Sequence, residues 1–295
     1  MRVATHPGNF HADDVFAVAV LRLAHGALEL VRTRDEAQLA AADLRVDVGG
    51  RSDPATGDFD HHQKGGAGER TNAIRYASFG LVWRQHGVAL AGSQAAADAI
   101  DARLVQGVDA NDTGQTVTTS LVGDVRPMTV SGVVAAMNAA WDEDLAPEAE
   151  DARFEEAVAL ATGILEREIA GAAAFARAHQ LVQDALARAG DPRIIELDRN
   201  MPWREAVVTG APEAVFVVYP KSDGWGLQAV PAQMGTFANR IDLPAAWGGL
   251  SGEALAQASG VPDAVFCHAA RFYASAGSRE GILALARGAF AAAGP

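Results

Sequence analysis

Apolar runs rich in β-branched residues alternate with helical patterns through residues 1–115, and this alternation limits the possible folds more than any other feature. Strands are expected at residues 2–5, 28–31 and 44–48. Between the first two strands, apolar side chains recur on one helical face at residues 13–24. Because strands that alternate with helices are typical of α/β proteins, the sequence predicts a mostly parallel sheet.

Further helices are predicted by their start and stop signals. Residues 33–36, Thr-Arg-Asp-Glu, have the spacing of a capping box and predict a helix directly after them. A helix at residues 74–86 should stop at Gly87, since glycine is common just beyond a helix end. Another helix should open at Ser93.

The stretch 149–190 is rich in alanine and charge and contains no proline, which predicts one very long helix or two helices in succession. The tail returns to shorter elements, with strands expected at residues 193–197, 214–219, 227–230 and 264–268 and a last helix at 278–290. We therefore expect three parts: an α/β domain (1–125), a long helical connector (126–190) and a smaller α+β domain (191–295).

Charge and cysteine content restrict the partners of the chain. With 37 acidic and 24 basic side chains, the formal net charge of the 295 residues is −13, which disfavours a broad surface for nucleic acid. A phosphate-bearing substrate would have to be bound locally. The single cysteine, Cys267, cannot form an internal disulfide or a thiolate metal cluster, so any metal would be held by imidazole and carboxylate groups.

The longest apolar stretch, residues 15–24, is interrupted by Arg22 and falls short of the ~18 residues of a membrane span, so we expect no membrane partner. The N-terminal residues lack the basic-then-apolar layout of a secretory signal. The expected location is the cytoplasm.

Histidine and aspartate gather where the predicted strands end. The segments HPGNFHADD (6–14), DVGG (47–50) and DFDHH (58–62) each follow or close an apolar run, and five of the eight histidines lie in the first 62 residues. In a parallel sheet the carboxyl ends of the strands meet along one edge, so these groups should converge there. A fourth segment, 109–114, is expected just after a helix and adds Asp109 and Asp112, either of which could be its contribution.

Six residues form the predicted ligand set: His6, His11, Asp13, Asp47, His61 and Asp112. Six ligands are too many for one catalytic ion with an open position, whereas two ions ~3.5–4 Å apart accommodate them. Asp47 is the expected bridge. Carboxylate and imidazole suit Mn²⁺, Mg²⁺, Zn²⁺ or Fe²⁺, and such a pair of ions favours phosphoester hydrolysis.

Four neighbouring side chains have expected roles in catalysis or substrate binding. His62 could hydrogen-bond the substrate phosphate or protonate the leaving oxygen. Asp60 is expected to orient one of the imidazoles. Lys64 and Arg70 flank a glycine-rich loop that could close over phosphate, although a solvated mobile loop is the simpler interpretation.

The ordered motifs HPGNFHADD, DVGG, DFDHHQ and DTG resemble the melanocyte-proliferating-gene family, a UPF0160-type group of metal-dependent hydrolases similar to the DHH phosphoesterases. The similarity continues through VPAQMGTFANRIDLPAAWGG and SREGILALA near the C-terminus. The chain departs from the family pattern at Pro7, where asparagine is common, and in the Asp112-Thr-Gly segment, where Asp-Asn-Gly is usual. Arg271 and Ala274 replace typical glycines.

The resemblance implies a DHH-like catalytic domain, a substrate-binding C-terminal domain and a substrate cleft between them. It also implies a binuclear centre of manganese type, held by the six predicted ligands, and 3′-to-5′ exonuclease activity on RNA or short oligonucleotides. In the C-terminal domain it places four residues towards the substrate: Arg240, His268, Ser278 and Arg279. Ser278 opens the last predicted helix, whose N-terminus is suited to phosphate.

Two other hypotheses remain open at the level of sequence. The net charge of −13 favours a small phosphoester, dinucleotide or pyrophosphate over a long RNA. Alternatively, the chain is a non-catalytic metal-binding scaffold whose long helix serves homo-oligomerisation. Six ligands from four segments argue for catalysis, because closed structural sites use fewer ligands.

Overall fold

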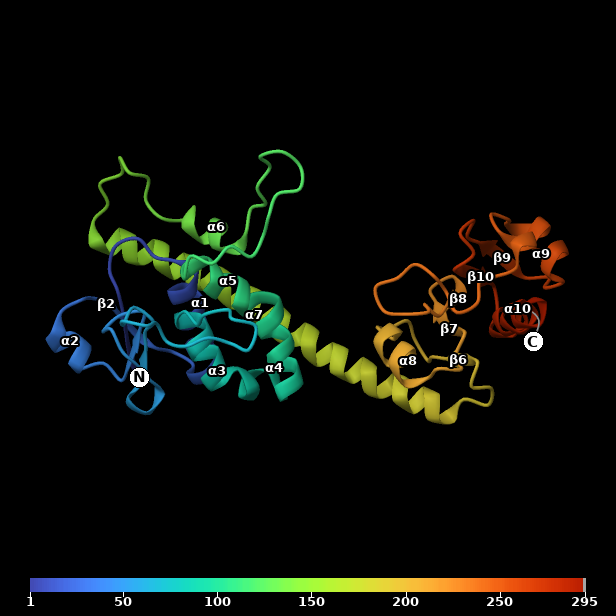
Figure 1. Cartoon of the computed structure of the whole chain (residues 1–295), viewed down its shortest axis with the longest axis horizontal. Helices are drawn as coiled ribbons and strands as arrows, with labels where there is room; N and C mark the ends of the chain where they lie inside the picture. The colour runs from blue at the N-terminus through green and yellow to red at the C-terminus, as the bar shows by residue number, and fades with distance from the viewer. Residues whose placement is uncertain (294–295) are drawn as a thin grey trace. The chain divides into compact units, whose positions relative to one another are not determined.

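The computed structural model describes residues 1–293, which form two compact units, residues 1–173 and residues 174–293 (Figure 1). Helix α7 (Pro147–Arg188) is one continuous helix of 42 residues and contributes to both units. The sequence had left open whether this stretch is one helix or two. The expected three-part division at residues 125 and 190 stays a prediction.

The first unit contains a five-stranded sheet in the order β2-β1-β3-β5-β4. Its strands are β1 (Arg2–Thr5), β2 (Glu29–Arg32), β3 (Leu44–Val46), β4 (Ser52–Asp53) and β5 (Asp58–Phe59). The first four in this order are parallel, and only β4 runs antiparallel, to β5. The expected α/β class with a mostly parallel sheet is therefore confirmed. Strands β4 and β5, with two residues each, are too short to give a periodic signal in the sequence.

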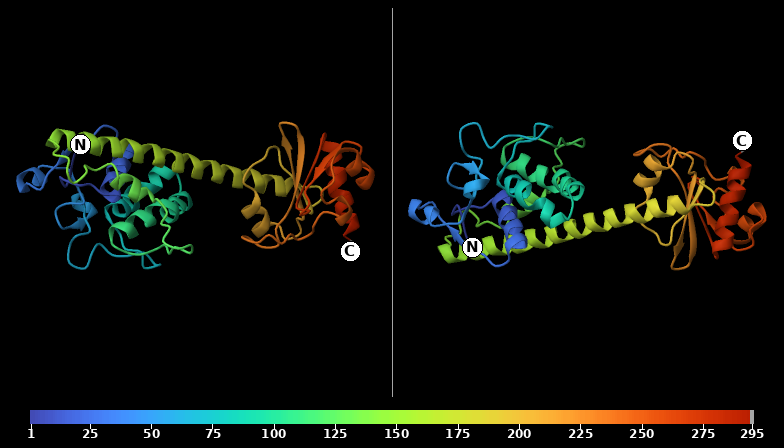
Figure 2. Two further views of the ribbon diagram at one scale, coloured as in Figure 1. Left: turned by 90° about the horizontal axis from the view of Figure 1, so that it is seen from above. Right: turned by 90° about the horizontal axis from the view of Figure 1, so that it is seen from below.

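Helix α1 (Ala12–His25) forms the centre of the first core. Every residue from Ala12 to Leu21 is buried, including Asp13 and Asp14, as expected for a helix that is covered on all sides. The first half of α7 runs along this core and adds Phe154 and Leu165 to it (Figures 1 and 2). The remaining elements of this unit are α2 (Glu36–Ala40), η1 (Pro54–Thr56), α3 (Ser78–Ala91), α4 (Gln94–Ile100), the π-helix η2 (Asp101–Val105), α5 (Gln106–Asp112) and α6 (Val130–Ala135).

The prediction that a helix stops at Gly87 was wrong for helix α3. The helix continues to Ala91 and ends before Gly92, which adopts the left-handed conformation. Gly87 is buried under Trp83, four residues earlier, and a Cβ there would lie 2.6 Å from the indole ring. The glycine therefore makes room for packing and does not end the helix.

Two further local predictions need correction. The cap of α2 is Asp35, whose side chain accepts a hydrogen bond from the N–H of Gln38, and not Thr33. The segment that begins at Asp109 was expected to follow a helix. Asp109 instead lies inside α5, because the π-helix η2 joins α4 to α5 without a break.

The second unit contains a sheet in the order β6-β7-β8-β10-β9, in which only β6 and β7 are parallel. Its elements are β6 (Ile194–Glu196), α8 (Arg204–Gly210), β7 (Phe216–Lys221), β8 (Gly224–Ala229), η3 (Ala245–Trp247), α9 (Gly252–Ser259), β9 (Ala264–Cys267), β10 (Tyr273–Ala276) and α10 (Arg279–Ala292). The expected α+β character is confirmed, but β10, α8 and α9 were not predicted.

Alternation along β7 explains the layers of the second unit. Phe216 and Val218 point into a core with α9 and α10, whereas Val217 and Tyr219 point into a core with α8 and the end of α7. Figure 2 shows helices on both faces of this sheet. Among residues 1–293, the helices lack the combination of length and apolar character that crossing a membrane requires.

Candidate metal centre

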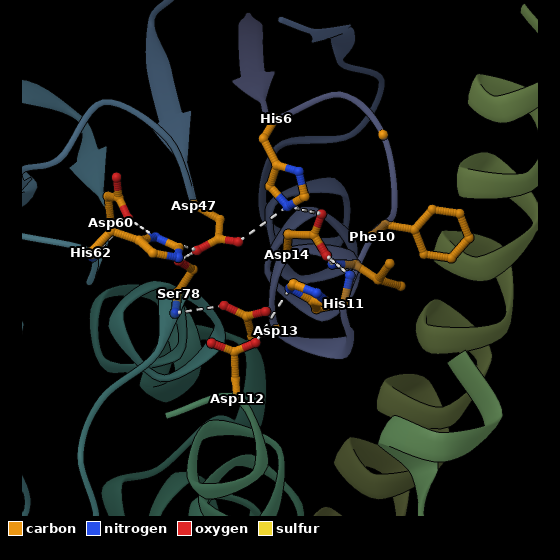
Figure 3. Close-up of polar contacts among 12 residues, drawn as sticks. His6, Phe10, His11, Asp13, Asp14, Asp47, Asp60, His62, Ser78 and Asp112 are labelled. Atoms are coloured by element: carbon orange, nitrogen blue, oxygen red, sulfur yellow. Dashed lines mark hydrogen bonds and ion pairs between the residues drawn. The ribbon is translucent and has the colours of Figure 1, made fainter. Parts of the chain in front are cut away.

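The predicted ligands converge at one edge of the first sheet, as Figure 3 shows. His6 directly follows β1, Asp47 directly follows β3, and His61 is the second residue after β5. Because these strands are parallel neighbours, the side chains that follow them lie at the same end of the sheet. Asp13 lies in the first turn of α1, and Asp112 is the last residue of α5.

Asp47 lies at the middle of the cluster. Its Oδ1 is 3.1 Å from His61 Nε2, and its Oδ2 is 3.3 Å from His6 Nε2. The residue has φ 56°, a left-handed conformation that costs energy for any residue with a Cβ. The surrounding structure therefore holds this carboxylate in an unfavourable backbone conformation between two imidazoles.

Asp112, and not Asp109, joins the cluster from α5. Its Oδ2 lies 3.0 Å from His61 Nε2 and its Oδ1 3.5 Å from His11 Nδ1. Asp109 is fully buried elsewhere, paired with Arg70 at 2.8 Å and accepting a hydrogen bond from the N–H of Gly80. Of the two residues that the sequence left open, Asp112 is therefore the one placed as a ligand would be, and its role as a ligand stays a prediction.

The cluster has the donor atoms that a divalent cation requires. Three groups have ligand atoms within 4.8 Å of one another: His6, His11 and Asp47; Asp47, His61 and His62; and His11, Asp13 and Asp112. Among residues 1–293, Asp13 Oδ1, Asp14 Oδ2 and Asp47 Oδ2 are buried without a hydrogen bond of ordinary geometry. Buried carboxylate oxygens in this state are costly unless a cation neutralises them, so these residues fit metal ions.

The pKa values describe the same charge imbalance. Burial raises the pKa of Asp13 well above its usual range, and the charges of Asp47 and Asp112 raise it further. Burial likewise raises the pKa of Asp14 to about 7, although His6 opposes this shift. Asp47 is the exception: burial works against its ionised form, but the close imidazoles of His6 and His61 lower its pKa.

His61 carries the complementary charge. Burial lowers its pKa, but the nearby carboxylates of Asp112 and Asp47 outweigh burial and raise the pKa to about 10. Without metal, the imidazole therefore holds a proton at neutral pH. A cation bound at this ring would displace that proton.

Asp60 holds His62 in place, in agreement with its predicted orienting role. Its Oδ1 lies 2.8 Å from His62 Nδ1 and accepts hydrogen bonds from the N–H groups of His61 and His62. Its Oδ2 accepts from the N–H of Gly50, 2.6 Å away. More than half of the His62 side chain is exposed, so the rest of its ring is open to a ligand.

The sequence analysis missed two residues of this site. Ser78 donates its hydroxyl to Asp47 Oδ1 at 2.9 Å, and its N–H, at the start of α3, donates to Asp13 Oδ2 at 3.2 Å. Asp14 lies 3.3 Å from His6 and accepts hydrogen bonds from the N–H groups of His11 and Val15. Asp14 is part of the HPGNFHADD motif and could have been recognised there. Ser78 could have been recognised only if the start of α3 had been predicted at Ser78 and not at residue 74.

The other predicted substrate-binding residues have contacts of their own. Lys64 is exposed, and Arg70 is engaged with Asp101 and Asp109. In the second unit, the guanidinium of Arg240 donates to the carbonyl groups of Val208, Ala211 and Ala214. Arg279 forms an ion pair with Glu196, and Ser278 caps helix α10. The Nδ1 of His268 accepts a hydrogen bond from the N–H of Ala270. Arg240 therefore supports the end of α8, and the roles of all these residues in substrate binding stay predictions.

Together, the fold and the site define an α/β protein with a carboxylate–imidazole centre suited to divalent cations. The family model described as an uncharacterised protein family (UPF0160) matches residues 2–290, and the chain belongs to this family. The resemblance noted in the motifs is thus confirmed.

Individual relatives agree with this assignment. The chain is 33% identical to the MYG1 exonuclease of Homo sapiens over 329 residues, covering 98% of the chain and 86% of the relative. It is 31% identical to a MYG1 protein of Saccharomyces cerevisiae, covering 97% and 94% of the two chains. Among solved structures, a pGpG-specific phosphodiesterase of Vibrio cholerae, PggH, aligns over 98% of this chain and 99% of its own at a TM-score of 0.34 and 13% identity.

Proposed function

We propose that the chain is a two-metal phosphodiesterase that removes nucleotides from the 3′ end of RNA or short oligonucleotides. The observation that carries the proposal is the cluster around Asp47. Among residues 1–293, one carboxylate oxygen each of Asp13, Asp14 and Asp47 is buried there without a hydrogen bond of ordinary geometry, and imidazole and carboxylate groups lie close enough to share a cation. Membership in a family with relatives named exonucleases supports this choice of reaction.

The ligands of the two ions would be the six predicted residues, with Asp47 shared between them. Asp47 belongs to two of the three metal-capable groups, which supports a bridging role. Bound ions of this kind acidify a water molecule and neutralise charge on a phosphoryl group. Mn²⁺ is the proposed metal, and Mg²⁺ is the alternative, since three of the six ligands are carboxylates.

The residues of the chain supply orientation and proton transfer. Asp60 fixes the ring of His62, which would donate a hydrogen bond to the phosphate or a proton to the leaving oxygen. Ser78 fixes the Asp47 carboxylate, and the N-terminus of α3 favours the negative charge of Asp13. The proposed substrate-binding residues remain Lys64, Arg240, His268, Ser278 and Arg279.

Short substrates are favoured by the charge of the chain. A net charge of −13 repels a long polyanion outside the site, so dinucleotides or small phosphoesters form the second candidate class. Rates on RNA of two, five and twenty nucleotides separate the candidates: a rate that rises with length excludes the small-substrate alternative.

The test is the release of nucleoside monophosphates from end-labelled short RNA in saturating Mn²⁺. Asp47→Ala should abolish release, whereas Asp98→Asn, at an exposed carboxylate on α4, should leave it unchanged. Comparison of 5′- and 3′-labelled RNA gives the polarity. Stoichiometric metal without turnover on any phosphoester would refute the proposal and favour the scaffold alternative.

Cellular location and assembly are proposals from the sequence. We propose that the protein acts in the cytoplasm, where its cysteine would stay reduced. A homo-oligomer built on α7 is the proposed assembly. Light scattering of the purified protein tests the second point: a monomeric mass would exclude it.

A further inference from the structure

A pocket of about 290 Å³ lies beside the metal centre in the first unit. It is lined by His61, Gly65, Gly66, Ala67, Gly68, Glu69, Arg75, Tyr76 and Thr113. This volume is close to the lower limit for small-molecule sites, ~300 Å³, and suits one nucleotide unit better than a longer fragment.

Two residues connect this pocket with the metal centre. His61 lines the pocket and lies 3.1 Å from Asp47 Oδ1 and 3.0 Å from Asp112 Oδ2. Thr113, also in the lining, directly follows Asp112. A ligand that fills the pocket would therefore lie against the same imidazole that contacts both carboxylates.

The far wall of the pocket is fixed by backbone pairing. Glu69 and Arg75 form an antiparallel bridge, and the N–H of Tyr76 donates to the carbonyl of Gly68. The side chain of Arg70 anchors this wall to the helical layer through ion pairs with Asp101 and Asp109. The glycine-rich loop is thus part of a built wall, in contrast to the free solvated loop that the sequence suggested.

The anchor couples the wall to the metal centre. Asp109 lies one turn before Asp112 in α5, so the buried Arg70–Asp109 pair positions both the pocket wall and a predicted metal ligand. Such support keeps a binding site preorganised.

The lining indicates hydrogen bonding as the mode of recognition. Arg70 and Arg84 lie over the ring of Tyr76, at 4.2 and 4.7 Å from its centroid, and compete with a base for its faces. Glu69 and Arg75 are exposed side chains on the bridged pair, one an acceptor and one a donor. This combination suits the hydroxyl groups of a ribose and the donor–acceptor edge of a base.

We infer that this pocket binds the terminal nucleoside of the substrate, with Glu69 and Arg75 as its hydrogen-bonding residues. The inference rests on the proposed function for the identity of the ligand. It assigns these residues to binding and selectivity, since they lie outside the set of predicted metal ligands.

Calorimetry with the Mn²⁺-loaded protein tests the inference without turnover. The probes are adenosine monophosphate and methyl phosphate, which share a phosphate but differ in the nucleoside. Wild-type protein should bind adenosine monophosphate about 10- to 100-fold more tightly, the range expected for hydrogen bonds to charged groups. Arg75→Ala should remove most of this preference and leave the affinity for methyl phosphate unchanged.

Arg103→Ala is the matched control, because Arg103 is an exposed arginine of the same unit that pairs with Glu168 away from the pocket lining. It should keep the full preference. If Arg75→Ala does not fold, Glu69→Gln replaces it and should also weaken only adenosine monophosphate. Equal affinities of the two probes for wild-type protein would overturn the inference.

The two proposals fail separately. A protein that prefers adenosine monophosphate but cleaves no oligonucleotide would refute the exonuclease and retain the pocket. A protein that cleaves oligonucleotides but shows no preference, or whose preference survives Arg75→Ala, would refute the pocket and retain the exonuclease.

Discussion

Replacing Asp14 by asparagine should stabilise the metal-free protein. The carboxylate is fully buried beside Asp13 and Asp47, yet its hydrogen bonds with the chain use only Oδ1, which accepts from the N–H groups of His11 and Val15. An asparagine carbonyl can keep both bonds. Asp14→Asn therefore removes the buried charge and retains the local geometry.

The magnitude follows from the pKa of Asp14, which burial raises from 3.8 to about 7. Because the folded state binds this proton more tightly than the unfolded state, the stability of the wild-type protein falls as the pH rises from 3.8 to about 7. At 1.36 kcal/mol per pH unit, the full penalty above pH 7 is up to about 4 kcal/mol. The asparagine variant lacks this penalty.

Urea unfolding in EDTA between pH 4 and pH 8 measures the effect. The free energy of unfolding of Asp14→Asn should exceed that of the wild type by an amount that grows up to pH 7 and then stays constant. Saturating Mn²⁺ should reduce the difference, because bound cations neutralise the same charges in the wild type. Asp98→Asn, at an exposed position, is the control. A difference that does not depend on pH, or a variant less stable than the wild type in EDTA at pH 8, would refute the reasoning.

Three further predictions concern packing and metal binding. Gly87→Ala should destabilise the protein by about 1–3 kcal/mol in thermal unfolding, since the added Cβ would meet Trp83. The control Gly107→Ala, at a position in α5 with open space around it, should be neutral or stabilising in the same assay. Mn²⁺ binding should release protons, and its affinity should rise between pH 6 and pH 8, because the pKa of His61 is about 10. Calorimetry in buffers of different ionisation enthalpy measures the number of protons released. Binding without proton release would contradict this prediction. Ser78→Ala should weaken Mn²⁺ binding by about 10- to 100-fold through loss of its hydrogen bond to Asp47, and unchanged affinity in a Mn²⁺ titration would exclude this role.

The convergence of the metal centre could be predicted from sequence because it depends on local signals and one rule of topology. His6, Asp47 and His61 each follow a strand, and parallel strands bring their carboxyl ends to one edge. The long helix α7 was visible in part: the proline-free stretch 149–190 predicts one long helix or two in succession, and the structure has one.

Other features depend on partners far apart in the chain. Arg70 flanks a loop that could close over phosphate, but its partner Asp101 is 31 residues away, and only the folded chain brings the two together. The sequence pattern at Gly87 predicts a helix end, but in the folded chain Trp83 packs against this glycine inside the helix. Ser78 received no role because its function depends on where α3 begins and on the position of Asp47. In each case tertiary packing overrides a local signal.

The central claim is that two divalent cations bind around Asp47. Anomalous diffraction from a crystal soaked in Mn²⁺ tests it most directly. We predict two peaks ~3.5–4 Å apart, both within coordination distance of Asp47, and their loss in Asp47→Ala crystals. A single peak, or none among these carboxylates and imidazoles at saturating Mn²⁺, would contradict the account.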